Sequence, residues 1–141
     1  MSLTGLEVFD RTIHHTNLWL LEIEGELGLN QRSTSWHVLR VVLGALRDRL
    51  PVEEAAHLSA QLPLLVRGVF FEGWRPAVHV RVRTREELVA RVRAEMQGIP
   101  VDAERACRAV FATLQRHVTP GELSDVRDVL PAELKGFLEP A

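Results

Sequence analysis

Apolar side chains recur every three or four positions over most of the chain, which is the spacing of amphipathic helices. One long helix is predicted first, with inward-facing positions at Leu6, Phe9, Ile13, Leu20, Ile23 and Leu27. A second helix is predicted to run through Trp36, Leu39, Val42, Leu43, Leu46 and Leu50. Prolines then open two shorter helices, at Pro51 and Pro63. The same plan follows from Thr84 to Leu138, so the fold class is predicted to be all-α.

Polar residues at the helix starts support these boundaries. Thr4, Thr84 and Thr119 each stand three residues before a glutamate, which is the spacing of a capping box. Asp102 is expected to cap the helix that follows it, because its side chain can accept from a first-turn amide.

The chain also aligns with itself at an offset of 68 residues. Between Trp36 and Phe70, 7 of 35 positions are identical. The identical pairs include Leu46 with Leu114, Glu54 with Glu122, and Leu62 with Leu130. We predict two tandem pseudo-repeat units of about four helices each, residues 1–71 and 84–141, packed as one globular bundle. Matched residues should then share their degree of burial.

Residues 72–83 are expected to form an extended linker between the units. Valines alternate here with polar residues, a period of two that is typical of extended backbone, at Val78, His79, Val80, Arg81, Val82 and Arg83.

Two runs, LRDRLPVEEAAHLSAQLPLLVRGVFFEGW and LQRHVTPGELSDVRDVLPAEL, resemble the bacterial domain-of-unknown-function family 2267. The resemblance extends from about Leu6 to Leu138, and its most specific part is the stretch from Leu62 to Trp74. It implies a helical fold. It implies no activity, cofactor or catalytic residue.

Three aromatic residues at the end of the first unit, Phe70, Phe71 and Trp74, form what we call the hook. The second unit has no counterpart. The favoured interpretation is that the hook packs under the linker and joins the two units. The alternative is a groove for a protein partner or a second copy, because aromatic residues are enriched in interfaces.

Charge and composition narrow the function classes. The formal net charge of -2 gives no global field that would attract nucleic acid or an anionic membrane. No run approaches the roughly 20 apolar residues that span a bilayer, and no signal peptide is recognisable. The single cysteine, Cys107, excludes an internal disulfide, so a cytoplasmic location is expected.

Candidate metal ligands are sparse. Glu7, Asp10 and His14 lie at helical spacing and form the best cluster for a small-ligand- or metal-dependent enzyme, although a solvated helix face is the simpler interpretation. His57 matches Asp125 at the 68-residue offset, and we expect positions that exchange such residues to be exposed polar sites rather than ligands.

Other catalytic signatures are missing: the sequence has no Gly-x-Ser-x-Gly elbow and no P-loop. Cys107 matches Leu39 at the same offset and is expected to be a small buried hydrophobe. Arg81, Arg83 and Arg85 are an alternative anion-binding set, but neighbouring glutamates can pair with them, so nucleic-acid binding is disfavoured.

The leading hypothesis is therefore a non-enzymatic bacterial adaptor or structural protein that acts through protein contacts, with self-association as one form, and with no cofactor. The alternative is the helical enzyme that would use Glu7, Asp10 and His14.

Overall fold

The computed structural model describes residues 2–76 and 82–139, and all regular elements in these ranges are helices. They are α1 (Glu7–Leu27), α2 (Arg32–Arg47), α3 (Val52–Ser59), α4 (Leu64–Phe71), α5 (Arg85–Glu95), α6 (Ala103–His117), α7 (Pro120–Val129), α8 (Ala132–Lys135) and a 3-10 turn, η1 (Gly136–Leu138). The predicted all-α class is confirmed.

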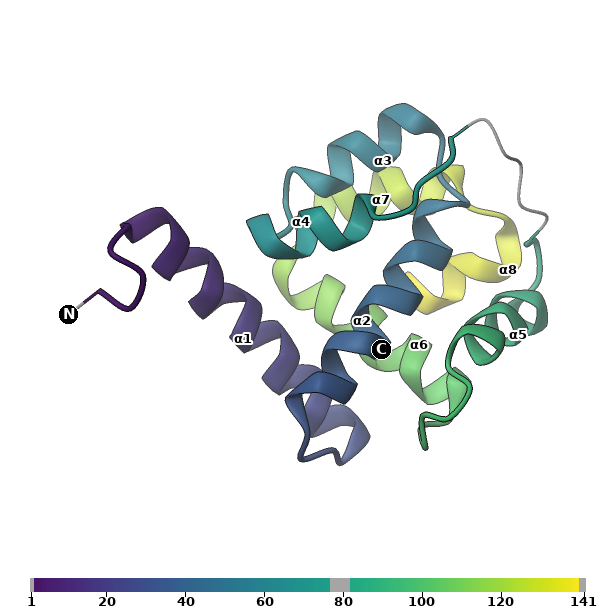
Figure 1. Ribbon diagram of the computed structural model, residues 1–141. Helices are drawn as coiled ribbons and strands as arrows, with labels where there is room; N and C mark the ends of the chain where they lie inside the picture. Colours follow the sequence, from purple (N-terminus) through teal and green to yellow (C-terminus); the bar gives the residue numbers. More distant parts are fainter. Residues whose placement is uncertain (1, 77–81, 140–141) are drawn as a thin grey trace.

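Two long helices, α2 and α6, pack against each other at the centre, and α1 and α5 each pack against both (Figure 1). Around this centre α4 contacts α1 and α2, η1 contacts α6, and α3 lies beside α7. The shared core is apolar, with Val38, Leu39, Val42, Leu43, Val110, Phe111 and Leu114 at most 2% exposed. The helices thus form a globular bundle.

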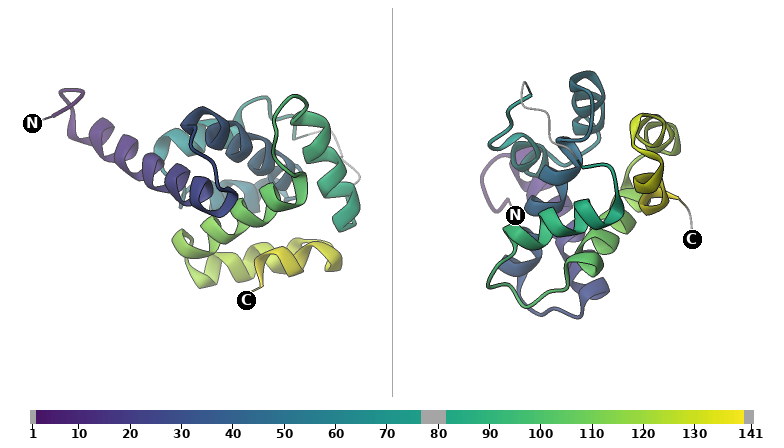
Figure 2. Two further views of the ribbon diagram at one scale, coloured as in Figure 1. Left: turned by 90° about the horizontal axis from the view of Figure 1, so that it is seen from below. Right: turned by 90° about the vertical axis from the view of Figure 1, so that its right-hand side faces the viewer.

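The first turns of α1 leave the bundle and extend past the other helices (Figure 2). From Thr12 onward α1 buries one stripe of side chains, whereas residues 2–9 are exposed. We call residues 6–11 the arm.

Helix starts follow the predicted caps in the second half of the chain. Thr84, Asp102 and Thr119 each accept a hydrogen bond from the amide three residues on. The capping box predicted at Thr4 is wrong, because α1 begins at Glu7. The carboxylate of Asp10 accepts from the amide and hydroxyl of Thr4 instead, at 2.9 and 2.8 Å.

The 68-residue offset relates several helix starts: α3 and α7 begin at Val52 and Pro120, and α4 and α8 at Leu64 and Ala132. Matched leucines are equally buried: Leu46 and Leu114 are 2% and 1% exposed, and Leu62 and Leu130 are 3% and 5% exposed. The duplication itself stays a prediction. Residues 77–81, five of the twelve residues of the predicted extended linker (72–83), lie outside the described residues.

Candidate functional site

The hook packs against the bundle core. Phe70 is fully buried, while Phe71 and Trp74 are partly buried against the same core. Their rings form a chain, with centroids 5.2 Å apart for Phe70 and Phe71 and 5.1 Å apart for Phe71 and Trp74. Gly73 adopts φ 69°, a left-handed conformation that costs glycine little, and so reverses the backbone before Trp74.

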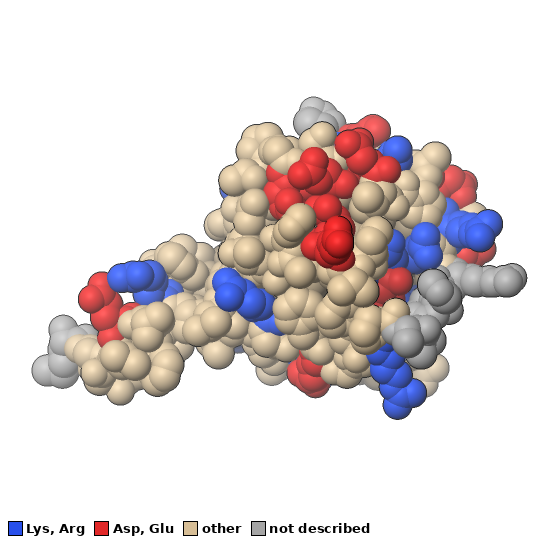
Figure 3. Space-filling model, turned by 90° about the horizontal axis from the view of Figure 1, so that it is seen from above, with Lys and Arg blue, Asp and Glu red and all other residues tan. Residues whose placement is uncertain are grey.

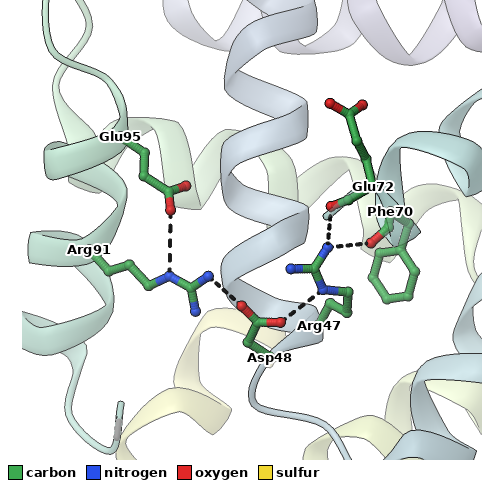
Figure 4. A network of polar contacts seen from close by, with 6 residues as sticks. All are labelled: Arg47, Asp48, Phe70, Glu72, Arg91 and Glu95. Carbon is green, nitrogen blue, oxygen red and sulfur yellow. Dashed lines mark hydrogen bonds and ion pairs between the residues drawn. The ribbon is translucent and has the colours of Figure 1, made fainter. Parts of the chain in front are cut away.

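A buried arginine fixes the backbone of the hook (Figure 4). Nη1 of Arg47 donates to the carbonyl oxygens of Phe70 and Glu72, at 2.9 and 3.0 Å. Arg47 is only 6% exposed, and its Nε donates to Asp48 at 2.9 Å. The end of α4 is thereby attached to α2 by a charge-assisted network.

The same network reaches α5 through Asp48, whose other oxygen accepts from Arg91. Burial acts to raise the pKa of Asp48, but the hydrogen bonds from Arg47 and Arg91 outweigh it and hold that pKa below its usual range. Arg91 also lies 3.9 Å from the carboxylate of Glu95. Asp48 therefore pairs with both arginines, and Glu95 adds a second negative charge beside Arg91.

An open cavity of about 370 Å³ lies beside this network, between α2, the end of α4 and α5. Its third arginine, Arg40, pairs with Glu72 at 2.6 Å. Each arginine of the cavity already has an acidic partner, although Nη1 of Arg91 is buried without a hydrogen-bond partner. We interpret the network as a structural connection between three helices.

The proposed N-terminal metal set is not assembled by the structure. The carboxylate of Asp10 accepts from Thr4, and Glu7 pairs with Arg11 at 2.8 Å. The ring of His14 lies nearest the ring of His15, 6.0 Å away between centroids. Hydrogen bonds from Ser2 and Thr4 lower the pKa of Asp10, so this carboxylate is engaged in starting the helix.

The alternative anion-binding set, Arg81, Arg83 and Arg85, is not seen as one site among the described residues. Arg81 lies outside the described residues. The guanidinium of Arg85 lies 4.4 Å from the centre of the Phe137 ring and 3.6 Å from Glu104. Arg83 is exposed, and its amide donates to Glu87 at 2.8 Å. Arg85 is thus paired within the fold, and the two described arginines do not form one free anion site.

Cys107 is fully buried, as the repeat predicted for a residue that matches leucine. Burial, followed by the nearby Glu104 and Asp102, raises the pKa of its thiol to about 12. A thiol reacts as its thiolate, so burial and the raised pKa both disfavour Cys107 as a nucleophile.

Sequence reasoning missed a group of acidic residues between α3 and α7. Glu54, Glu122 and Asp125, which we call the acidic cluster, each place one carboxylate oxygen within 4.8 Å of the others. Carboxylates gather on the face of the molecule that carries these helices (Figure 3). Asp125 is exposed as expected, but it lies beside the partly buried carboxylate of Glu54 and the buried carboxylate of Glu122.

The most buried member of the acidic cluster is Glu122, which is only 8% exposed. Burial, the neighbouring carboxyl of Glu54 and the charge of Asp125 all raise its pKa, to about 7. One oxygen of Glu122 and one of Glu54 are buried without a hydrogen-bond partner. The pairing of Glu54 with Glu122 at the 68-residue offset is a signal in the sequence that could have drawn attention to this cluster.

Comparison with known proteins identifies a family for this chain. A family model described as "Uncharacterized conserved protein (DUF2267)" matches residues 16–137. The chain belongs to this family. The comparison with curated proteins returns no match. The part of the chain that matches DUF2267 contains the hook, the Arg47 network and the acidic cluster, whereas the arm precedes it.

The DUF2267 model brings no activity with it. In the part of the chain that the structure describes, no helix has both the length and the apolar character needed to cross a membrane.

Proposed function

We propose that this protein is a non-enzymatic bacterial adaptor or structural protein of the cytoplasm, and that it acts through protein–protein contacts made by the arm. The partner that fits the arm best is a second copy of the chain. The observation that carries the proposal is the apolar stripe of α1, which continues beyond the bundle that buries the rest of it.

Within the bundle, the stripe follows helical spacing through Thr16, Leu20, Ile23 and Leu27, all of them buried. The same spacing extended toward the N-terminus reaches Phe9 and then Leu6. These two side chains are 50% and 49% exposed, because the bundle ends before them. The arm therefore presents a face of core character with no core beneath it in the single chain.

A second apolar surface lies where α1 leaves the bundle. Leu64 and Leu65, at the start of α4, are 49% and 45% exposed. The amide of Leu65 donates to the hydroxyl of Thr12 at 3.1 Å, which places these leucines beside the base of the arm. Exposed apolar patches of this kind are typical of interaction sites.

Both surfaces are apolar and exposed, and one molecule carries both. A two-fold axis near Thr12 would lay the arm of each copy over Leu64 and Leu65 of the other. Such an interface is isologous and closes at a dimer. Burying Phe9 in it would remove roughly 100 Å² of apolar surface from water, worth about 2–3 kcal/mol per copy.

Size-exclusion chromatography with light scattering, over a range of protein concentrations, tests the proposal. We expect the unmodified protein to form a dimer and Phe9→Asp to shift it to monomer without loss of helix content. Val52→Asp is the matched control, because Val52 is 52% exposed on α3 and the substitution introduces the same charge. It should leave the dimer intact.

Two results would overturn this proposal. The unmodified protein could be monomeric at every concentration measured, which excludes the second copy as partner. Alternatively, Phe9→Asp and Val52→Asp could weaken the dimer equally, which excludes the arm as the contact.

A further inference from the structure

The acidic cluster contains carboxylate oxygens that the fold leaves without partners. Glu122 is 8% exposed, and its Oε1 is buried with no hydrogen-bond partner. The Oε1 of Glu54 is likewise buried with no hydrogen-bond partner. Buried polar atoms are nearly always paired, so these two oxygens need either a proton shared between Glu54 and Glu122 or a bound cation.

The local structure shows why Glu122 is turned into the cluster. A glutamate at this position of a capping box normally accepts from the backbone amide of the capping threonine. Here Gln61 takes that amide: its Oε1 accepts from the Thr119 amide at 2.7 Å, and its Nε2 donates to the Thr119 hydroxyl at 3.0 Å. The Thr119 hydroxyl still accepts from the amide of Glu122, at 3.3 Å, so α7 keeps its cap while the Glu122 carboxylate is released.

We propose that Glu54, Glu122 and Asp125 bind one divalent cation that prefers oxygen ligands, between the first turns of α3 and α7. The ion would accept the orphaned oxygens of Glu54 and Glu122 as ligands. Asp125 would close the site on its solvent side, where water can supply the remaining ligands.

The donor set defines the class of ion. Three carboxylates are hard oxygen ligands, the type that Ca²⁺, Mg²⁺ and Mn²⁺ prefer over thiolate-seeking metals. Ca²⁺ holds its ligands at about 2.3–2.6 Å, so oxygens on opposite sides of the ion stand roughly 5 Å apart. The three oxygens already lie within 4.8 Å of one another, which is compatible with such an ion without movement of either helix.

A histidine lies at the edge of the site. His57 follows Glu54 by one turn of α3, and its Nδ1 is 3.9 Å from the Glu54 carboxylate. Its side chain is 67% exposed and free to reorient. A nitrogen ligand here would favour Mn²⁺ over Ca²⁺ and Mg²⁺, so the three ions are compared as separate probes.

Isothermal titration calorimetry of the full chain, first stripped with EDTA and dialysed, tests the site with CaCl₂, MgCl₂ and MnCl₂ in turn. We expect at least one of these ions to bind at one equivalent. Glu122→Gln and Asp125→Asn should each weaken binding by at least about tenfold, since even residues that only orient metal ligands contribute about 10–100-fold. The loss of the Mn²⁺ electron paramagnetic resonance signal on binding is a second readout.

Matched controls exist on the same two helices. Glu53→Gln on α3 and Asp128→Asn on α7 each remove one negative charge from an exposed neighbour of the acidic cluster, and both should leave binding unchanged. Circular dichroism in EDTA checks that every variant is folded, and Glu54→Gln replaces any variant that is not. The inference is overturned if none of the three ions binds, or if the control variants weaken binding as much as the cluster variants do.

Discussion

Replacing Glu122 by glutamine should stabilise the folded protein above pH 7 and have little effect at pH 5. Burial and the carboxyl of Glu54 raise the pKa of Glu122 from 4.5 to about 7. The folded state therefore holds a proton between these pH values that the unfolded state has already lost. Stability falls with rising pH wherever the folded state binds more protons, so Glu122 destabilises the fold progressively from about pH 4.5 to pH 7.

The size of the effect follows from the shift. Each pKa unit corresponds to about 1.4 kcal/mol, so the whole shift is worth on the order of 3 kcal/mol at pH 8. Solvent reaches the cluster on the side of Asp125, which is exposed, and we expect screening to reduce this to roughly 2–3 kcal/mol. Glutamine has the same shape as the protonated acid, so the variant should lack this pH dependence.

The assay is urea denaturation in EDTA at several pH values from 5 to 8, in the original protein and in Glu122→Gln. The difference in unfolding free energy reports the titration of Glu122 together with the neighbouring carboxyls of Glu54 and Asp125, because groups outside the cluster, such as Asp48, are common to both proteins. Glu53→Gln serves as the control, and its difference should stay constant over this range. The reasoning is refuted if the Glu122→Gln difference is also constant, or if that variant is the less stable protein at pH 8.

Three further predictions concern the rest of the molecule. Arg47→Ala should destabilise the fold by about 3–5 kcal/mol in chemical denaturation, because it leaves the carbonyls of Phe70 and Glu72 unpaired and removes one of the two guanidiniums that pair with the partly buried Asp48. The partly exposed Arg40→Ala should cost under about 1 kcal/mol. Trp74→Ala should lower the free energy of unfolding by about 1–3 kcal/mol, which is less than the loss at a fully buried aromatic residue because Trp74 is only partly buried. If the ring packs internally, this loss should be the same at two protein concentrations. Cys107 should resist a thiol-specific disulfide reagent in the native protein and react in denaturant; equal rates in both conditions would contradict its burial.

Much of the fold could be predicted because it depends on local signals. Helical periodicity and the caps at Thr84, Asp102 and Thr119 involve residues within one or two turns of each other. The capping-box rule failed at Thr4, because both Glu7 and Asp10 are close enough in sequence to contact this threonine. Asp10 accepts from Thr4, which leaves Glu7 free to pair with Arg11.

The important polar contacts could not be predicted, because they join residues that only the tertiary fold brings together. Arginine is normally exposed, so nothing in the pattern marks Arg47 as a buried residue that binds carbonyls 23 and 25 residues away. Glu122 was interpreted as half of a capping box. Gln61, which takes the Thr119 amide in its place, lies 58 residues before Thr119 in the chain, so this contact depends on how α3 and α7 pack.

The Arg47 network and the acidic cluster are built from similar residue types but differ in how completely they are satisfied. In the network, Asp48 lies between two guanidiniums, and opposite charges hold its pKa down. In the acidic cluster, carboxylates face one another and leave buried oxygens of Glu54 and Glu122 unpaired. A network in which opposite charges are paired stabilises one arrangement of helices without a bound ion, even though Nη1 of Arg91 lacks a hydrogen-bond partner. An unpaired cluster costs stability that a bound cation would restore, which is why the two sites lead to different experiments.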